Sequence, residues 1–304
     1  MKKILPFFII IFSIIYLQSR PIPKTNPSNK FDKIRALGDL AYQVNLGPRT
    51  PKSEAHAKTI QYINEQLKDA GWLVENQQQD ISGIKITNII GNWGNLTPWI
   101  LIGAHYDSRI FANRDSNPVN RTKPVPGAND GASGVAVILE LARIIPNYHQ
   151  TWANKISLVL FDAEDNGDIN GWEWIMGSQY YVTQLKSYPD YVVIIDMIGD
   201  SKLNIYYEAN SDLNLSTTIW NNAAELGYSS IFIPKLKYRI IDDQIPFVRI
   251  GIPTAEIIDF DYPYWHTTQD TLDKISSTSL NIIGDTLIAW IDNKESGKKL
   301  ENPR

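Results

Sequence analysis

PWILIGAHYDS, residues 98–108, joins an unbroken apolar run to a histidine and an aspartate. Short apolar runs bounded by polar or turn residues are typical of strands that are buried on both faces of a sheet. KISLVLFDA (155–163) and DYVVIIDMIGD (190–200) repeat the pattern, and both runs also lead into acidic residues. GASGVAVILELARII (131–145) separates the first two runs and is long and apolar enough for a buried helix. This order of strand, helix and further strands indicates an α/β fold.

The segments on either side extend the alternation. IKITNIIGNW (84–93) predicts a strand, and STTIWNNAAELG (216–227) predicts a helix. Apolar residues recur at helical spacing between residues 31 and 71, where LGPRTP (46–51) interrupts them, so we expect two helices there. The whole pattern predicts a three-layer α/β/α sandwich with a central mixed, mostly parallel sheet.

Composition limits the classes of function. Of the 304 residues, 43% are hydrophobic and 20% are charged, which is enough apolar material for one large domain, expected over residues 30–304. The net charge is −4 and no basic stripe occurs, so we expect no nucleic-acid partner. Cysteine is absent, which excludes a disulfide framework, and any metal site must be built from histidine, aspartate and glutamate.

The N-terminus has the composition of an export segment. Two lysines precede an apolar stretch at residues 4–17, which is shorter than the roughly twenty residues of a full membrane span. We therefore expect residues 1–19 to be a signal peptide or, because no small-x-small cleavage site follows, an N-terminal membrane anchor. Residues 20–29 then form a linker. The folded part is expected outside the cytoplasm, secreted or periplasmic, with the membrane contacted only through the N-terminal segment.

Several of the predicted strands end in side chains that carry chemistry. The run after residue 98 leads into His105 and Asp107, the run after 155 leads into Glu164 and Asp165, and the run after 190 leads into Asp196. In open α/β sheets the ligand crevice lies beyond the carboxyl ends of the strands. We therefore expect these ends to converge on one site.

Each candidate also has a purely structural interpretation. An aspartate at a strand end is often a turn or cap residue, and Asp130 in PGANDGASG would suit the N-cap of the following helix. His105 could equally be a core histidine, and we assign no site role to His56 or His149. Zinc needs about four N or O donors, and two histidines with several carboxylates meet that requirement. The adjacent carboxylates of Glu164 and Asp165 would repel each other when buried, which favours a cation beside one of them.

Seven motifs occur in order along the chain: GAHYDSR, PGANDGASGVAVILELAR, LVLFDAED, GSQYYV, IDMIGD, DDQIPF and YWHTTQDTLD. This set resembles the zinc exopeptidase-fold family that includes glutaminyl cyclases of the animal and bacterial secretory type and co-catalytic zinc aminopeptidases. The resemblance runs from LGPRTP to a final helix near Trp290. It implies a catalytic domain that acts on peptides or proteins with a free N-terminus, expected as a monomer.

The resemblance implies roles for individual residues. Asp130, Asp165 and His266 would bind the zinc ion found in both branches of the family, and Glu164 would be the general base. In the aminopeptidases, His105 and Asp196 would bind a second zinc ion.

The cyclases of this family hold one zinc ion, and there Asp196 would instead join a proton network with Asp242. All of the potential ligands for both ions are present, so the number of ligands does not distinguish a site with one zinc ion from a site with two.

Aromatic residues favour the cyclase branch. The resemblance places Trp265, Tyr262 and one of Trp172 and Trp174 around a narrow substrate pocket. The chain departs from the animal cyclases at two positions. Glu256 and Gln244 each stand where those cyclases have a histidine. The alternatives are an aminopeptidase with two zinc ions and a non-catalytic binding ectodomain of the same fold.

Overall fold

The computed structural model describes residues 30–81, 83–94, 100–148 and 150–295. The expected leader and linker, residues 1–29, lie outside the described residues, as does His149. Within the described ranges, no helix has the length and apolar character needed to cross a membrane.

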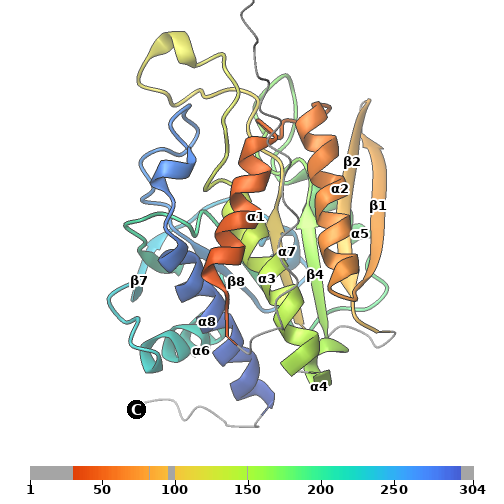
Figure 1. The fold of residues 1–304 in the computed structure, drawn as a ribbon, viewed down its shortest axis with the longest axis vertical. Helices are drawn as coiled ribbons and strands as arrows, with labels where there is room; N and C mark the ends of the chain where they lie inside the picture. The colour runs from red at the N-terminus through yellow and green to blue at the C-terminus, as the bar shows by residue number, and fades with distance from the viewer. Residues whose placement is uncertain (1–29, 82, 95–99, 149, 296–304) are drawn as a thin grey trace, which may run out of the picture.

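A six-stranded sheet in the order β1-β2-β4-β3-β5-β8 forms the centre of the fold (Figure 1). Strands β4, β3, β5 and β8 are parallel to one another, whereas β1 and β2 are antiparallel to their neighbours. The predicted mixed, mostly parallel sheet is thus confirmed. The bounds are β1 Leu73–Ile81, β2 Ile84–Asn92, β3 Ile100–His105, β4 Ile156–Phe161, β5 Tyr191–Asp196 and β8 Thr254–Ile258.

Strands β3 and β4 are buried along their whole length, which explains why their sequences are continuous apolar runs. Their parallel register pairs Ile100 with Ile156 and His105 with Phe161, so both strands end at the same level. Strands β1 and β8 were not predicted from the sequence. The side chains of β1 are polar along most of its length, and only one of its edges pairs with another strand of the sheet.

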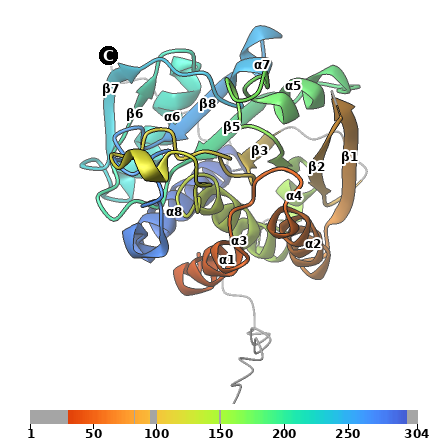
Figure 2. The same cartoon turned by 90° about the horizontal axis from the view of Figure 1, so that it is seen from above.

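Helices cover both faces of the sheet, as Figure 2 shows from above. Helices α1, α2, α3 and α8 pack on one face, where the large apolar core includes Leu40, Ile138 and Leu287. Helices α5 and α7 pack on the other face, where Phe161 of β4 contacts Phe247 with ring centroids 6.1 Å apart. The predicted three-layer sandwich is therefore confirmed. The bounds are α1 Lys33–Asn45, α2 Glu54–Asp69, α3 Ala132–Tyr148, α5 Met176–Thr183, α7 Ile245–Arg249 and α8 Ser277–Glu295.

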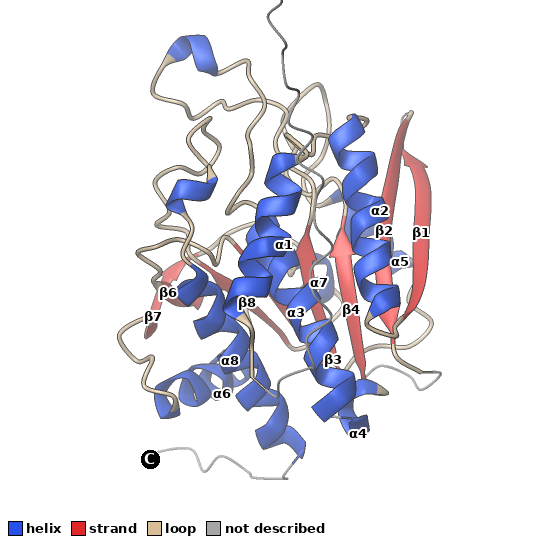
Figure 3. Cartoon of the chain, in the orientation of Figure 1, coloured by secondary structure: helices blue, strands red, loops and turns tan. Residues whose placement is uncertain are grey.

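A small parallel sheet of β6 and β7 lies beside β8 and packs against α6. Long loops connect the elements beyond the carboxyl ends of the parallel strands, where Figure 3 shows them as a tan layer with few helical turns. These loops supply the side chains described next. The remaining bounds are β6 Ile205–Glu208, β7 Phe232–Tyr238, α6 Leu213–Glu225, α4 Gln150–Ala153, and the 3₁₀ turns η1 Pro118–Asn120 and η2 Leu272–Lys274.

Candidate metal centre

The carboxyl ends of three neighbouring strands bring the candidate residues together. His105 is the last residue of β3, and Asp196 is the last residue of β5. Glu164 and Asp165 follow the end of β4 within a few residues. All four side chains are buried, and Glu164 is the most exposed of them at 7%. The predicted convergence of the strand ends is therefore present in the structure.

Left-handed backbone conformations orient this group of side chains. Ala163 and Met197 have φ values of 53° and 47°, and His266 has a φ of 57°. Residues with a Cβ atom seldom adopt positive φ, and such strained positions concentrate at functional sites. Each of the three lies in or beside a turn that carries a candidate side chain. No pattern of apolar residues signals these conformations in advance.

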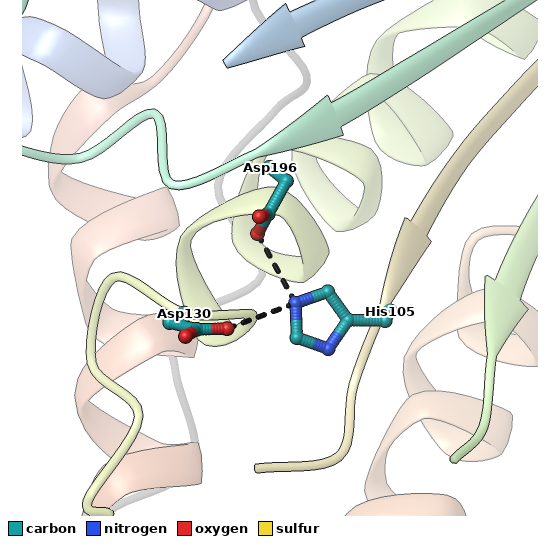
Figure 4. A group of neighbouring side chains, drawn as sticks. All are labelled: His105, Asp130 and Asp196. Carbon is teal, nitrogen blue, oxygen red and sulfur yellow. Dashed lines mark hydrogen bonds and ion pairs between the residues drawn. The ribbon is translucent and has the colours of Figure 1, made fainter. Parts of the chain in front are cut away.

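His105, Asp130 and Asp196 form the first donor group. The Nε2 atom of His105 lies 3.1 Å from Oδ1 of Asp196 and 3.2 Å from Oδ1 of Asp130 (Figure 4). Figure 4 shows that the three side chains converge from β3, from the end of β5 and from the loop that precedes α3. The ligand atoms of the three residues lie within 4.8 Å of one another, close enough to bind one metal ion.

Asp130, Asp165 and His266 form the second donor group, so Asp130 belongs to both groups. Nε2 of His266 lies 2.7 Å from Oδ1 of Asp165 and 3.8 Å from Oδ2 of Asp130. The Oδ2 atoms of Asp130 and Asp165 are buried and have no hydrogen-bond partner among the described residues. Buried carboxylate oxygens without a partner are costly, and a bound cation removes that cost.

Protonation in the second donor group also suits a cation. Burial lowers the pKa of His266 to about 3, so its imidazole is neutral at pH 7. Burial, together with the charge of Asp130, raises the pKa of Asp165 well above its usual range. Without a metal, a proton between Nε2 of His266 and Oδ1 of Asp165, which lie 2.7 Å apart, lets the two groups form a hydrogen bond. A divalent ion can replace that proton, because neutral imidazole and carboxylate are both zinc ligands.

Asp107 connects the ends of β3 and β4. Its Oδ1 accepts the backbone N–H of Glu164 over 3.1 Å, and its Oδ2 accepts that of Asp165 over 3.3 Å. The Oδ2 atom also accepts the Asn166 side-chain amide over 3.0 Å. Asp107 is fully buried and is outside both donor groups. It is a supporting residue that fixes the loop that carries Glu164 and Asp165.

Asp270 supports Asp130 in the same way. Its carboxylate accepts the backbone N–H groups of Asn129 over 2.8 Å and of Asp130 over 3.2 Å. The hydroxyl of Tyr262 donates to Asp270 over 2.7 Å, and Tyr262 is 4% exposed. The structure therefore places Tyr262 behind the donor group, where it braces Asp270. It is absent from the residues that line the cavity beside His266.

The segment of His266 is held to the long loop between β3 and α3. Asp115 accepts the backbone N–H of Thr268 over 3.0 Å as well as its hydroxyl. The backbone N–H of Arg114 donates to the carbonyl oxygen of His266 over 3.2 Å. The sequence analysis assigned no role to Asp115, since a buried aspartate in a loop resembles any turn residue.

Close packing at Gly131 fixes His105. A Cβ atom at this position would lie 2.5 Å from the carbonyl oxygen of His105 and 2.6 Å from its ring. Only glycine allows the start of α3 to approach β3 this closely.

Glu164 lies among further buried carboxyl groups. Burial raises its pKa well above the usual range, and the charge of Asp242 raises it further. Burial also raises the pKa of Asp243 to about 7 and that of Glu256 well above its usual value. The polar side-chain atoms of Glu256 and Gln244 have no hydrogen-bond partner among the described residues. Glu164 is thus a buried carboxyl group with a strongly raised pKa, a property common in residues that carry protons at functional sites.

Two tryptophans flank His266. The ring of Trp265 lies 4.0 Å from the imidazole, and that of Trp174 lies 6.1 Å away with the planes 5° apart. Both line a cavity of about 490 Å³ beside His266. Trp172, the alternative to Trp174, lies in a different cavity, where it packs near Ile81. The two tryptophans are two residues apart in a loop with left-handed residues at Gly171 and Ile175, and their indoles line different cavities.

Comparison with known proteins identifies the family to which the chain belongs. Residues 88–291 match the model of peptidase family M28, and the chain belongs to this family. An aminopeptidase of Bacillus subtilis is 26% identical over 293 residues, which cover 86% of this chain and 56% of that protein. The chain therefore spans just over half the length of this relative. A glutaminyl-peptide cyclotransferase of Boiga irregularis is 26% identical over 295 residues, which cover 80% of this chain and 76% of that protein.

Among solved structures, the glutaminyl cyclase of Porphyromonas gingivalis superimposes with a TM-score of 0.83 at 30% identity. The match covers 88% of this chain and all of that chain. The family includes zinc exopeptidase-like folds, as the resemblance implied. Both the cyclase and the aminopeptidase branch are represented among these similar proteins.

Proposed function

We propose that the protein cyclises the N-terminal glutamine of peptides or proteins to pyroglutamate and releases ammonia. The observation that carries the proposal is the position of Trp174 and Trp265 on either side of His266. The two indoles give the cavity an apolar wall beside the donor group, which suits the compact conformation that a glutaminyl side chain needs for ring closure. The similarity to glutaminyl cyclases over nearly the whole domain supports the same conclusion.

Asp130, Asp165 and His266 would hold one zinc ion. When bound there, zinc would supply Lewis acidity toward the γ-carbonyl oxygen of the glutamine. The remaining chemistry falls to the side chains of this chain. Trp174 and Trp265 would orient the substrate and exclude water, and Glu164 would move the proton.

The proton balance assigns one carboxylate two tasks. The α-amine nitrogen forms a bond to the γ-carbonyl carbon, and a carboxylate oxygen of Glu164 accepts the proton that this nitrogen loses. The bond from the γ-carbon to the amide nitrogen then breaks, and Glu164 returns the proton to the departing ammonia. Burial and the charge of Asp242 raise the pKa of Glu164, which strengthens its hold on the proton between the two steps. Asp196 and Asp242 would hold the substrate amine.

The first donor group favours an aminopeptidase as the alternative function. Its residues, His105, Asp130 and Asp196, could hold a further ion beside the one held by the second donor group. Two ions that share Asp130 would suit hydrolysis of the first peptide bond, with Glu164 deprotonating the attacking water.

One assay separates the two functions. The purified full-length protein, loaded with zinc, is offered an N-terminal glutaminyl peptide and a leucyl chromogenic amide. Ammonia release from the first substrate without hydrolysis of the second is the expected result, with one zinc ion per chain by mass spectrometry of the folded protein. Hydrolysis of the leucyl amide with two zinc ions per chain would overturn the proposal.

A further inference from the structure

The cavity beside His266 has two arginines in its lining, and they differ in how they are paired. The residues that line it include Arg109, Arg114, Asp168, Trp174 and Trp265. Asp168 is the acidic residue of this lining, and its carboxylate accepts the indole N–H of Trp174 over 3.2 Å. The cavity wall therefore carries more positive than negative charge.

Arg109 is buried, and its guanidinium group is hydrogen-bonded within the protein. It is 3% exposed, and its guanidinium donates to the carbonyl oxygen of Asp165 over 2.6 Å and to that of Gly167 over 3.4 Å. Its Nε donates to Asn113 over 2.9 Å. These bonds account for its role as a support of the Asp165 loop.

Arg114 lines the same cavity, but its side chain is exposed. Its guanidinium carbon lies 3.9 Å from the centre of the Trp265 ring. Within the described ranges, no hydrogen bond or ion pair of its guanidinium group is found, and only its backbone N–H is bonded, to His266. Contact with the indole holds the charge in place while the N–H groups stay available.

We propose that Arg114 binds a carboxylate on the residue that follows the substrate's N-terminal residue. The inference rests on the proposed function, because it places the reacting glutamine beside His266. The ring centre of Trp265 lies 4.0 Å from that of His266 and 3.9 Å from the guanidinium carbon of Arg114. The guanidinium and the donor group therefore contact the same indole. A carboxylate is the group that a planar guanidinium recognises with two parallel hydrogen bonds.

Such a carboxylate has two sources in a peptide. One is the side chain of aspartate or glutamate as second residue, and the other is the terminal carboxylate of a dipeptide. The test therefore measures kcat/KM for Gln-Glu-amide, Gln-Gln with a free carboxylate, and neutral Gln-Gln-amide. Ammonia release is the readout for all three, on the unmodified protein and on Arg114→Gln, Arg114→Glu and Arg249→Gln. Arg249 is exposed on α7 and lies outside the cavity, so its variant is the matched control.

We expect the unmodified protein and Arg249→Gln to prefer at least one carboxylate substrate over the neutral one by about three- to ten-fold, a factor that falls as salt is added. The ratio should fall to about one in Arg114→Gln and below one in Arg114→Glu. The measured quantity is the ratio of kcat/KM for a carboxylate substrate to kcat/KM for the neutral substrate. An effect of a variant that is equal for the two substrates cancels in this ratio. The substrate that is preferred identifies the source of the carboxylate.

Equal ratios in the unmodified protein and in Arg114→Gln would overturn the inference. So would a preference that survives charge reversal in Arg114→Glu. If no substrate releases ammonia, the proposed cyclisation itself fails, and this result differs from ammonia release without discrimination.

Discussion

The backbone N–H of Glu164 donates to Oδ1 of Asp107 over 3.1 Å, which ties the proton carrier to the neighbouring strand end. The second carboxylate oxygen of Asp107 holds the next residue, Asp165. One buried side chain thus sets the position of both the proposed base and a proposed metal ligand. Its replacement tests how much the reaction depends on support from outside the donor groups.

We expect Asp107→Ala to lower kcat/KM by about 10- to 100-fold, the effect typical of residues that orient metal ligands. The loop loses three hydrogen bonds to the two carboxylate oxygens of Asp107, and buried N–H groups are left without partners. Circular dichroism should remain unchanged. Asp273→Ala changes an exposed aspartate of η2 that is outside both donor groups, so this variant is the control and should retain full activity. Full activity in Asp107→Ala would contradict a positioning role.

Glu164→Gln preserves shape and removes the ability to accept a proton. We expect turnover of a glutaminyl peptide to fall by about 10²- to 10⁴-fold, because general acid–base catalysis contributes that much. Glu164 is outside both donor groups, so zinc content by mass spectrometry should stay the same. An active variant would remove Glu164 from the mechanism, and a variant that loses zinc would make it a ligand.

Gly131→Ala would force a methyl group into His105. The hypothetical Cβ lies 2.5 Å from a backbone oxygen, which cannot rotate away as a flexible side chain could. We expect the midpoint of thermal unfolding to fall together with activity, because overpacking typically costs about 1–3 kcal/mol. Gly38→Ala, in the exposed face of α1 with no atom within 4 Å of the new methyl group, is the matched control. It should be neutral or stabilising, since alanine favours helices over glycine. The prediction fails if the two variants behave alike.

Trp174→Ala and Trp172→Ala separate the two candidate tryptophans. Trp174 is parallel to the imidazole of His266, so its loss should raise KM for a glutaminyl peptide by about tenfold through lost burial and contact. Trp172 lies in another cavity, and its loss should leave KM unchanged. Steady-state kinetics on both variants decides the matter, and the reverse ranking would contradict the placement of the indoles.

The buried pair of His56 and Asp162 predicts a pH-dependent stability. Nε2 of His56 lies 2.7 Å from Oδ1 of Asp162. Burial lowers the pKa of His56, but the hydrogen bond and charge of Asp162 outweigh it and raise the pKa above the ordinary value. A raised pKa stabilises the fold at pH values below the unfolded pKa, and the stabilisation is lost as pH rises through the folded pKa.

We therefore expect His56→Gln to reduce the free energy of unfolding by about 2 kcal/mol at pH 6, as for a hydrogen bond to a charged group. The difference from the unmodified protein should shrink toward pH 9. Urea unfolding at both pH values measures it, and a difference that is constant with pH would show that the histidine is neutral throughout.

The sequence was sufficient for strands β2, β3, β4 and β5 of the sheet and for the convergence of the ends of β3, β4 and β5. Buried parallel strands leave continuous apolar runs, and the parallel arrangement places their carboxyl ends at one edge. His105, Asp165 and Asp196 follow from those two facts. Asp130 and His266 lie in loops, and only the resemblance to a known family connected them to the same site.

The supporting residues could not be inferred in this way. Asp107 and Asp270 act through hydrogen bonds to backbone groups that are distant along the chain, and composition carries no signal of such bonds. Trp172 and Trp174 lie in an irregular loop with left-handed residues on both sides of the pair, so no periodic pattern indicates which indole lies beside His266. Strand β1 was missed because its polar side chains lack the apolar alternation by which strands are recognised.

Asp130 belongs to both donor groups, whereas every other member belongs to one. A mutation of His105 or Asp196 would therefore leave the trio of Asp130, Asp165 and His266 complete, but a mutation of Asp130 would damage both trios together. The capacity for one ion and the capacity for two ions thus both depend on a single carboxylate.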